Sequence, residues 1–171
     1  MPHPISALGA AHTAVSLVTF AAGLVSYVRY KTIERHTGAG RLYLLGMLVS
    51  VLTSFGLSST GGFNAGHALG ILALLATFGG LVVPALDFLG RARLYLSALA
   101  FAFSFFLLLV PGINETLTRL PVGRPLASGP DSPLVRVSLA VWLGIFVIGA
   151  LVQCLWLRST RSRTAVPVDA P

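Results

Sequence analysis

Charged side chains are scarce in this chain. Only 10% of its 171 residues are charged and 55% are apolar, whereas a typical soluble domain is about 25% charged. A soluble fold with this composition would have almost no polar surface to cover its core. The sequence therefore predicts an integral membrane protein.

Cysteine and acidic residues are also rare. The single cysteine, Cys154, excludes a disulfide within the chain, a Cys-ligated iron–sulfur cluster and a thiolate zinc site. The five Asp and Glu residues all fall outside the middle of the apolar runs, so a buried carboxylate relay for protons cannot be built. The chain also lacks a Ser–His–Asp constellation and a nucleotide-binding loop. This pattern favours a non-enzymatic protein and leaves a redox role open.

Five apolar runs are long enough to cross a bilayer, which takes about 20 residues. The predicted spans are 5–28, 42–58, 64–86, 94–110 and 137–157. Pro84 predicts a kink at the end of the third span, and Pro111 with Gly112 predicts the end of the fourth. We expect an all-α bundle of five transmembrane helices within residues 1–157, followed by a basic, disordered tail at 158–171.

Lysine and arginine side chains concentrate on one side of these spans. With the N-terminus outside, all of the 12 basic residues except Arg119, Arg124 and Arg136 lie in cytoplasmic segments. The positive-inside rule therefore predicts an outer N-terminus and a cytoplasmic C-terminus. The net charge of +7 accordingly indicates contact with anionic membrane lipids and not with nucleic acid.

Small residues recur every four positions along the second and third spans. This spacing lets two helix backbones approach closely in lipid, so we expect the two ridges to pack together. The fifth span has fewer small residues and is expected to be peripheral or to contact a partner. The ridges consist of Gly46, Ser50, Ser54 and Ser58 on the second span, and of Gly62, Gly66 and Gly70 on the third.

Two histidines lie at a similar depth towards the outer side. His12 shares a helix face with small and hydroxyl residues, which we expect to point inward. His67 lies on or beside the glycine ridge of the third span, one turn after Phe63. With a rise of 1.5 Å per residue, both rings come out about 10–13 Å from the midplane. Such a pair could ligate one haem b iron or one metal ion, bracket a quinone head group or pass protons, with Phe63 in the wall of a cofactor site. Hydrogen bonds to neighbouring helices are the alternative.

A glycine-containing segment joins the first two spans on the cytoplasmic side. Its glycines permit a tight turn with exposed amides just before a helix. His36, Gly40 and Arg41 therefore form a candidate cradle for an anion or a lipid head group. The alternative is a basic hairpin that only touches anionic lipid.

Several of these residues belong to two short sequence patterns. The pattern H-x-x-x-G-R-x-Y occupies residues 36–43, and G-G-F-x-x-x-H occupies residues 61–67. Over about residues 10–75 the chain resembles an uncharacterised bacterial family of multi-pass membrane proteins that contain a domain of unknown function. The resemblance implies an integral, helical protein of the plasma (inner) membrane and supplies no activity. Members also carry a histidine before the fourth helix, where this chain has Arg91-Ala92-Arg93, so no ligand role is transferred there.

Three functions are compatible with these features. The leading hypothesis is a haem- or quinone-binding protein in electron transfer or respiratory-complex maturation, with His12 and His67 as the ligand pair. The second is a non-catalytic accessory subunit or assembly factor bound to another membrane protein or to a second copy of the chain. The third is a small-solute transporter.

Overall fold

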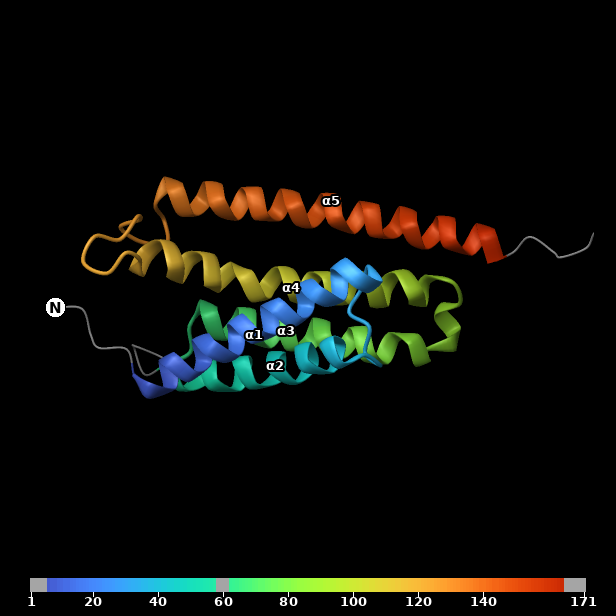
Figure 1. The fold of residues 1–171 in the computed structure, drawn as a ribbon, viewed down its shortest axis with the longest axis horizontal. Helices are drawn as coiled ribbons and strands as arrows, with labels where there is room; N and C mark the ends of the chain where they lie inside the picture. The colour runs from blue at the N-terminus through green and yellow to red at the C-terminus, as the bar shows by residue number, and fades with distance from the viewer. Residues whose placement is uncertain (1–5, 58–61, 165–171) are drawn as a thin grey trace, which may run out of the picture.

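The computed structural model is an all-helical bundle that describes residues 6–57 and 62–164, with side chains up to residue 160 (Figure 1). Within these ranges five helices are long and apolar enough to cross a membrane, which confirms the predicted all-α class. The helices are α1 (Ala7–Tyr30), α2 (Gly38–Ser54), α3 (Ala65–Val82), α4 (Ala92–Arg119) and α5 (Pro133–Thr164), with short 3-10 turns η1 (Phe55–Leu57), η2 (Val83–Ala85) and η3 (Asp87–Leu89).

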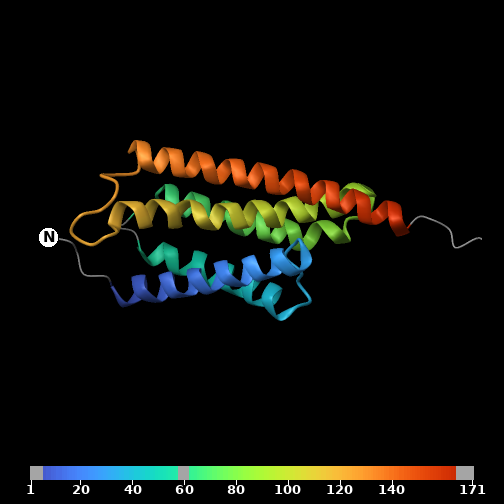
Figure 2. The same ribbon diagram turned by 45° about the horizontal axis from the view of Figure 1, so that its top comes forward.

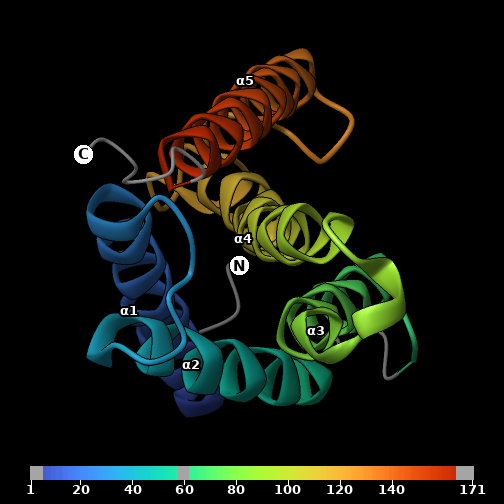
Figure 3. The ribbon, with the colours of Figure 1, turned by 90° about the vertical axis from the view of Figure 1, so that its right-hand side faces the viewer.

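Consecutive helices alternate in direction, so the start of α1 and the end of α5 lie at opposite ends of the bundle (Figures 1 and 2). Viewed along the bundle, α2 lies between α1 and α3, and α4 lies between α3 and α5 (Figure 3). The α5 helix contacts the rest of the bundle mainly through α4. It is therefore a peripheral helix, as its sequence predicted.

The second helix begins at Gly38, four residues before the predicted boundary at 42. The side-chain oxygen of Thr37 accepts a hydrogen bond from the Gly40 amide at 3.1 Å and so caps the new N-terminus. Gly40 and Arg41 consequently lie inside the first turn of α2. The prediction that they belong to a loop with exposed amides was wrong, because a capping threonine precedes them.

The fourth helix was predicted to end at residue 110, and this was wrong. It continues through Pro111 to Arg119. A proline removes one backbone hydrogen-bond donor from a helix. Beyond Pro111, an ion pair between Glu115 and Arg119, one turn apart, supports the last turns of α4. At 28 residues, α4 is about 42 Å long and exceeds the hydrocarbon core of about 30 Å. In a bilayer its polar last turns would therefore extend beyond the hydrocarbon.

The fifth helix is also longer than predicted. It begins at Pro133, a residue suited to the first helical position, and continues to Thr164. Residues 158–164 are thus helical rather than part of a disordered tail, while residues 165–171 lie outside the described part. The connection between α4 and α5 shortens to residues 120–132, and its buried Ala127 donates an amide hydrogen bond to Leu117 O at 2.9 Å.

Small residues bring α2 close to α1 and not only to α3. A Cβ on Gly46 would lie 2.0 Å from Thr19 Oγ1 of α1, whereas Gly70 of α3 faces Val51 of α2 at 3.1 Å. The expectation that the two ridges meet each other is therefore corrected for Gly46, because α2 is shared by two neighbours. Ser58 lies outside the described residues.

Candidate functional site

The face of α1 that was predicted to point inward does so. Its Thr19, Gly23 and Ser26 are buried. Near the start of the helix, His12 Nδ1 lies 2.9 Å from Thr53 Oγ1, and Ser16 Oγ donates to Ser50 Oγ at 3.1 Å. This face therefore forms a ladder of polar contacts between α1 and α2.

The direction of the hydrogen bond between His12 and Thr53 depends on the imidazole tautomer. The Thr53 hydroxyl also lies 2.8 and 3.0 Å from the backbone carbonyls of Val49 and Ser50. Because a hydroxyl has one proton to give, donation to either carbonyl leaves the Thr53 oxygen to accept from His12 Nδ1–H. In either tautomer this bond ties His12 to α2.

Both ring nitrogens of the buried His67 are engaged. Its Nδ1 accepts a hydrogen bond from the Asn64 amide at 3.3 Å, while Asn64 Oδ1 accepts from the His67 amide at 3.1 Å. This reciprocal pair is a capping box at the start of α3. His67 Nε2 then donates to Ser54 O of α2 at 3.2 Å. The rings of Phe55 and Phe63 flank His67 at centroid distances of 4.9 and 5.7 Å.

These bonds bear directly on the predicted haem site. Both histidines lie at one end of the bundle, as predicted, but they bond to consecutive residues of α2, Thr53 and Ser54. Because α2 lies between α1 and α3 (Figure 3), the two histidines belong to helices on different sides of α2. An iron ligand needs a nitrogen lone pair, and the single one on His67 is used by the cap. The arrangement therefore does not fit a haem shared by His12 and His67.

Metal ligation by a larger cluster has no support either. In the described ranges, no three His, Cys, Asp or Glu side chains come together in a way that could hold a metal ion.

The predicted head-group cradle is only partly accessible. Gly40 is buried, and a Cβ there would lie 1.9 Å from Glu34 O, so this glycine is required for close packing. Its amide is used by Thr37. His36 and Arg41 are exposed, and His36 Nε2 accepts a hydrogen bond from Arg35 Nε at 3.1 Å. Two of the three predicted residues therefore remain available to a lipid head group.

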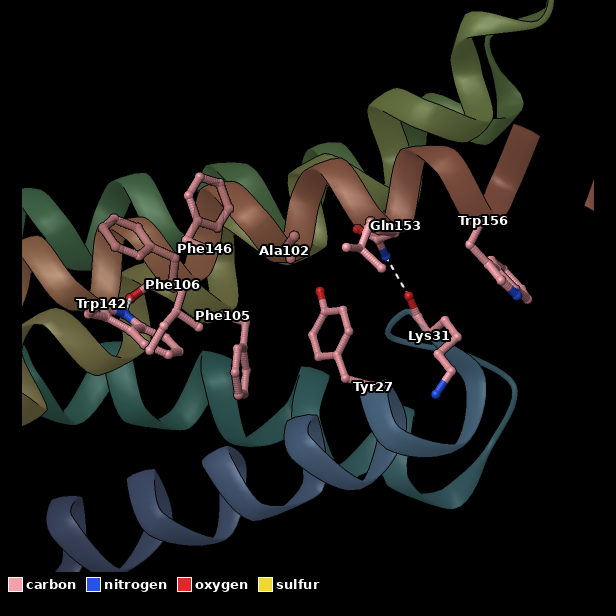
Figure 4. A pocket seen from close by; sticks show the side chains of 12 residues that line it. Tyr27, Lys31, Ala102, Phe105, Phe106, Trp142, Phe146, Gln153 and Trp156 are labelled. Carbon is pink, nitrogen blue, oxygen red and sulfur yellow. Dashed lines mark hydrogen bonds between the residues drawn. The ribbon is translucent and has the colours of Figure 1, made fainter. Parts of the chain in front are cut away.

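A cavity between α1, α4 and α5 was not found by sequence reasoning (Figure 4). Its volume is about 340 Å³, within the range of about 300–1,000 Å³ that is usual for small-molecule sites. The lining residues are mostly aromatic or aliphatic: Tyr27, Lys31, Ala102, Phe105, Phe106, Trp142, Ile145, Phe146, Gly149, Val152, Gln153 and Trp156.

Aromatic rings form one end of this cavity. Trp142 of α5 stacks on Phe106 of α4 at a centroid distance of 6.2 Å, and its Nε1–H donates to Phe106 O at 3.0 Å. Phe146 packs on the same Phe106 ring at 4.9 Å. The indole position is thus set by a hydrogen bond as well as by packing, which gives the cavity a rigid aromatic wall.

Two buried polar atoms in the cavity wall have no hydrogen-bond partner among the described residues: the Tyr27 hydroxyl and Gln153 Oε1. Gln153 is only 6% exposed. Its Nε2 donates to Lys31 O at 2.6 Å, and Tyr27 lies beside this bond in the cavity (Figure 4). A buried polar group without a partner costs about 1–3 kcal/mol. These atoms are therefore candidates for contacts with a ligand.

A weak signal for this site was present in the sequence. Gln153 interrupts the apolar run of the fifth span, and an intramembrane polar residue is a functional hypothesis by default. Tyr27 lies 126 positions earlier in another span, so only the folded chain reveals that the two side chains line one cavity.

No protein-family model matches this chain, and no curated protein or solved structure is similar to it. The family resemblance of residues 10–75 stays a prediction, and the functional argument rests on the residues themselves.

Proposed function

We propose that this protein is a multi-pass plasma-membrane protein that binds a quinone-class lipid in the cavity between α1, α4 and α5. The observation that carries this proposal is the pairing of two unpartnered polar atoms, Tyr27 Oη and Gln153 Oε1, with an aromatic wall. A quinone head is a flat ring with polar oxygen atoms, so it suits both features. Binding of such a lipid would give this protein a non-catalytic role in electron transfer or in respiratory-complex maturation.

The position of the cavity supports an occupant with an apolar tail. Two of its lining residues on α5, Ile145 and Val152, are 53% and 59% exposed. In a bilayer such exposed apolar side chains face acyl chains. A tail could therefore run from the cavity into the lipid without crossing water.

Intrinsic fluorescence tests this function. The chain has two tryptophans, and both Trp142 and Trp156 line the cavity. We expect a short-tailed benzoquinone, added to protein in nanodiscs, to quench their emission along a saturable curve. A matched reporter replaces both tryptophans with phenylalanine and introduces Leu75→Trp on α3, where the native side chain is 62% exposed. The reporter should show only linear quenching, and linear quenching of the native chain would contradict the proposal.

Haem ligation is the competing form of the redox hypothesis. Because His67 uses both nitrogens in structural bonds, we expect the purified protein to show no Soret band in either redox state. A Soret band that disappears in His12→Ala and in His67→Ala would instead favour the histidine pair.

The second candidate function is an accessory subunit whose α5 contacts a partner helix. It is supported by the peripheral position of α5 and by Gly144, where an added Cβ would meet no atom within 4 Å. Small residues on a lipid-facing surface allow close helix approach. If this function is correct, Gly144→Ile should release a co-purifying membrane protein, whereas Gly79→Ile on α3 should not.

A further inference from the structure

We infer that the cavity selects the reduced, hydroquinone form over the oxidised quinone. This inference rests on the proposed function and concerns the chemistry of the same site. It follows from which hydrogen-bonding groups of Tyr27 and Gln153 remain available to a ligand.

The side-chain amide of Gln153 has a determined orientation. Lys31 O is a carbonyl and can only accept, so the atom of Gln153 that lies 2.6 Å from it must be the NH₂ group. The other end of the amide, Oε1, is then the buried atom without a partner. Gln153 therefore presents a buried acceptor without a partner. The second N–H of its NH₂ group can donate to either redox form of a ligand and does not discriminate between them.

The partner of this bond is held in place by its own surroundings. Lys31 ends α1 in a left-handed conformation, with φ of 62°, and its amide donates to Tyr27 O at 3.0 Å. Its ammonium group donates to Val28 O at 3.0 Å. The Lys31 carbonyl that orients Gln153 thus belongs to a capped helix end. Its fixed position holds the Gln153 amide in one orientation.

The two redox forms differ in what they offer to these groups. A quinone ring carries two carbonyl oxygens, which only accept, and a hydroquinone carries two hydroxyls, which donate and accept. The Tyr27 hydroxyl can donate to either form. Of the two forms, only the reduced one has a hydroxyl that can donate to Gln153 Oε1. The oxidised ring leaves this buried acceptor without a partner.

The expected preference is about tenfold, since one additional hydrogen bond to a buried group has an effect of that order on a dissociation constant. By linkage, tighter binding of the reduced form raises the midpoint potential of the bound couple. For a two-electron couple a tenfold preference corresponds to about 30 mV.

Calorimetry in nanodiscs under anaerobic conditions tests the selectivity with a short-tailed benzoquinone and its hydroquinone as probes. For the native chain we expect the hydroquinone to bind about tenfold more tightly. Gln153→Leu should bring the ratio of the two affinities close to one. Tyr27→Phe should weaken both forms. Trp142→Phe, which loses the bond to Phe106 O but retains Gln153, is the matched control and should keep the ratio.

The outcomes separate the two proposals. Equal affinities in the native chain, or tighter binding of the quinone, would overturn the selectivity and leave the proposed function standing. Binding of neither probe would overturn the proposed function. The decisive ratio is measured on the unaltered chain, so the test does not depend on the folding of a variant.

Discussion

At the scale of single residues, Tyr43 illustrates how a motif position can serve the fold. Its side chain is fully buried, and its hydroxyl lies 2.7 Å from Ser104 Oγ, so it joins α2 to α4. Gly40, three positions earlier in the same motif, is required by the nearby Glu34 carbonyl. Two residues of the H-x-x-x-G-R-x-Y pattern are thus explained by packing and hydrogen bonding, without any ligand.

The bond between Tyr43 and Ser104 should couple the two positions energetically. Hydrogen bonds between membrane helices contribute about 0.6 kcal/mol on average and up to about 1.7 kcal/mol. We expect a coupling in this range from a double-mutant cycle of Tyr43→Phe and Ser104→Ala, measured by unfolding in mixed micelles. Tyr30→Phe, at an exposed position near the end of α1, is the control and should have little effect. Additive effects of Tyr43→Phe and Ser104→Ala would show that the bond does not contribute.

At the scale of helices, close approach between neighbouring helices depends on glycines, which leave room for a side chain of the facing helix. Gly46 admits Thr19 of α1, and Gly80 of α3 admits the ring of Phe101 of α4. Close packing of this kind replaces the hydrophobic effect, which is absent between helices in lipid. The pairing of α1 with α2 and of α3 with α4 is consequently specified by where the glycines lie.

Gly46→Ala should destabilise the bundle by about 1–3 kcal/mol, because the new methyl group would overlap Thr19 Oγ1. Adding Thr19→Ala should recover part of this loss by removing that oxygen. Gly79→Ala, where nothing lies within 4 Å, is the control and should stabilise the helix by up to about 1 kcal/mol. The free energy of unfolding in mixed micelles measures all three, and equal values for Gly46→Ala and Gly79→Ala would contradict the packing described.

The extent of the fold that sequence could predict also becomes clear at this scale. Length and apolarity are local properties, so all five spans were found. The ends of α4 and α5 were not predicted correctly. Pro111 was expected to stop α4, but the helix continues through it. The last turns of both helices are polar, so apolarity alone does not show that they are helical. The polar face of α1 was predicted from its period. The partner of that face was not, since pairing depends on residues such as Gly46 and Thr19 in different spans.

For the whole molecule, the distribution of basic residues predicts an outer N-terminus. Arg29, Arg35 and Arg41 lie at the end of the bundle where α1 finishes and α2 begins, whereas Arg124 lies in the connection at the opposite end. This asymmetry is what the positive-inside rule requires of a protein with this orientation. With the predicted orientation, the end of the cavity that includes Lys31, at the end of α1, would lie towards the cytoplasmic leaflet.

Cysteine labelling checks the orientation. In a Cys154→Ser background, which removes the single native thiol, Arg124→Cys should react with an impermeant maleimide in intact cells. Arg91→Cys should react only after the membrane is permeabilised. The reverse pattern would show that the chain is inserted the other way.

Some residues of the candidate sites could be recognised in the sequence, whereas others could be recognised only in the folded chain. His12 and His67 were noticed because they are ionisable residues in apolar runs, and they do lie at one end of the bundle. Their hydrogen bonds to Thr53 and Ser54 depend on how α2 is placed between α1 and α3. Tyr27 and Gln153 attract less attention in a sequence, and their common cavity requires α5 to cover α1 and α4.

Photo-crosslinking tests the central claim most directly. A short-tailed benzoquinone with a photoreactive group on its ring would be irradiated with the protein in nanodiscs, and the adducts would be mapped by mass spectrometry. The account predicts adducts on cavity residues of α1, α4 and α5, such as Tyr27, Phe105 and Trp142, and competition by unlabelled hydroquinone. Saturable adducts at His67 and Phe63, with none in the cavity, would contradict it.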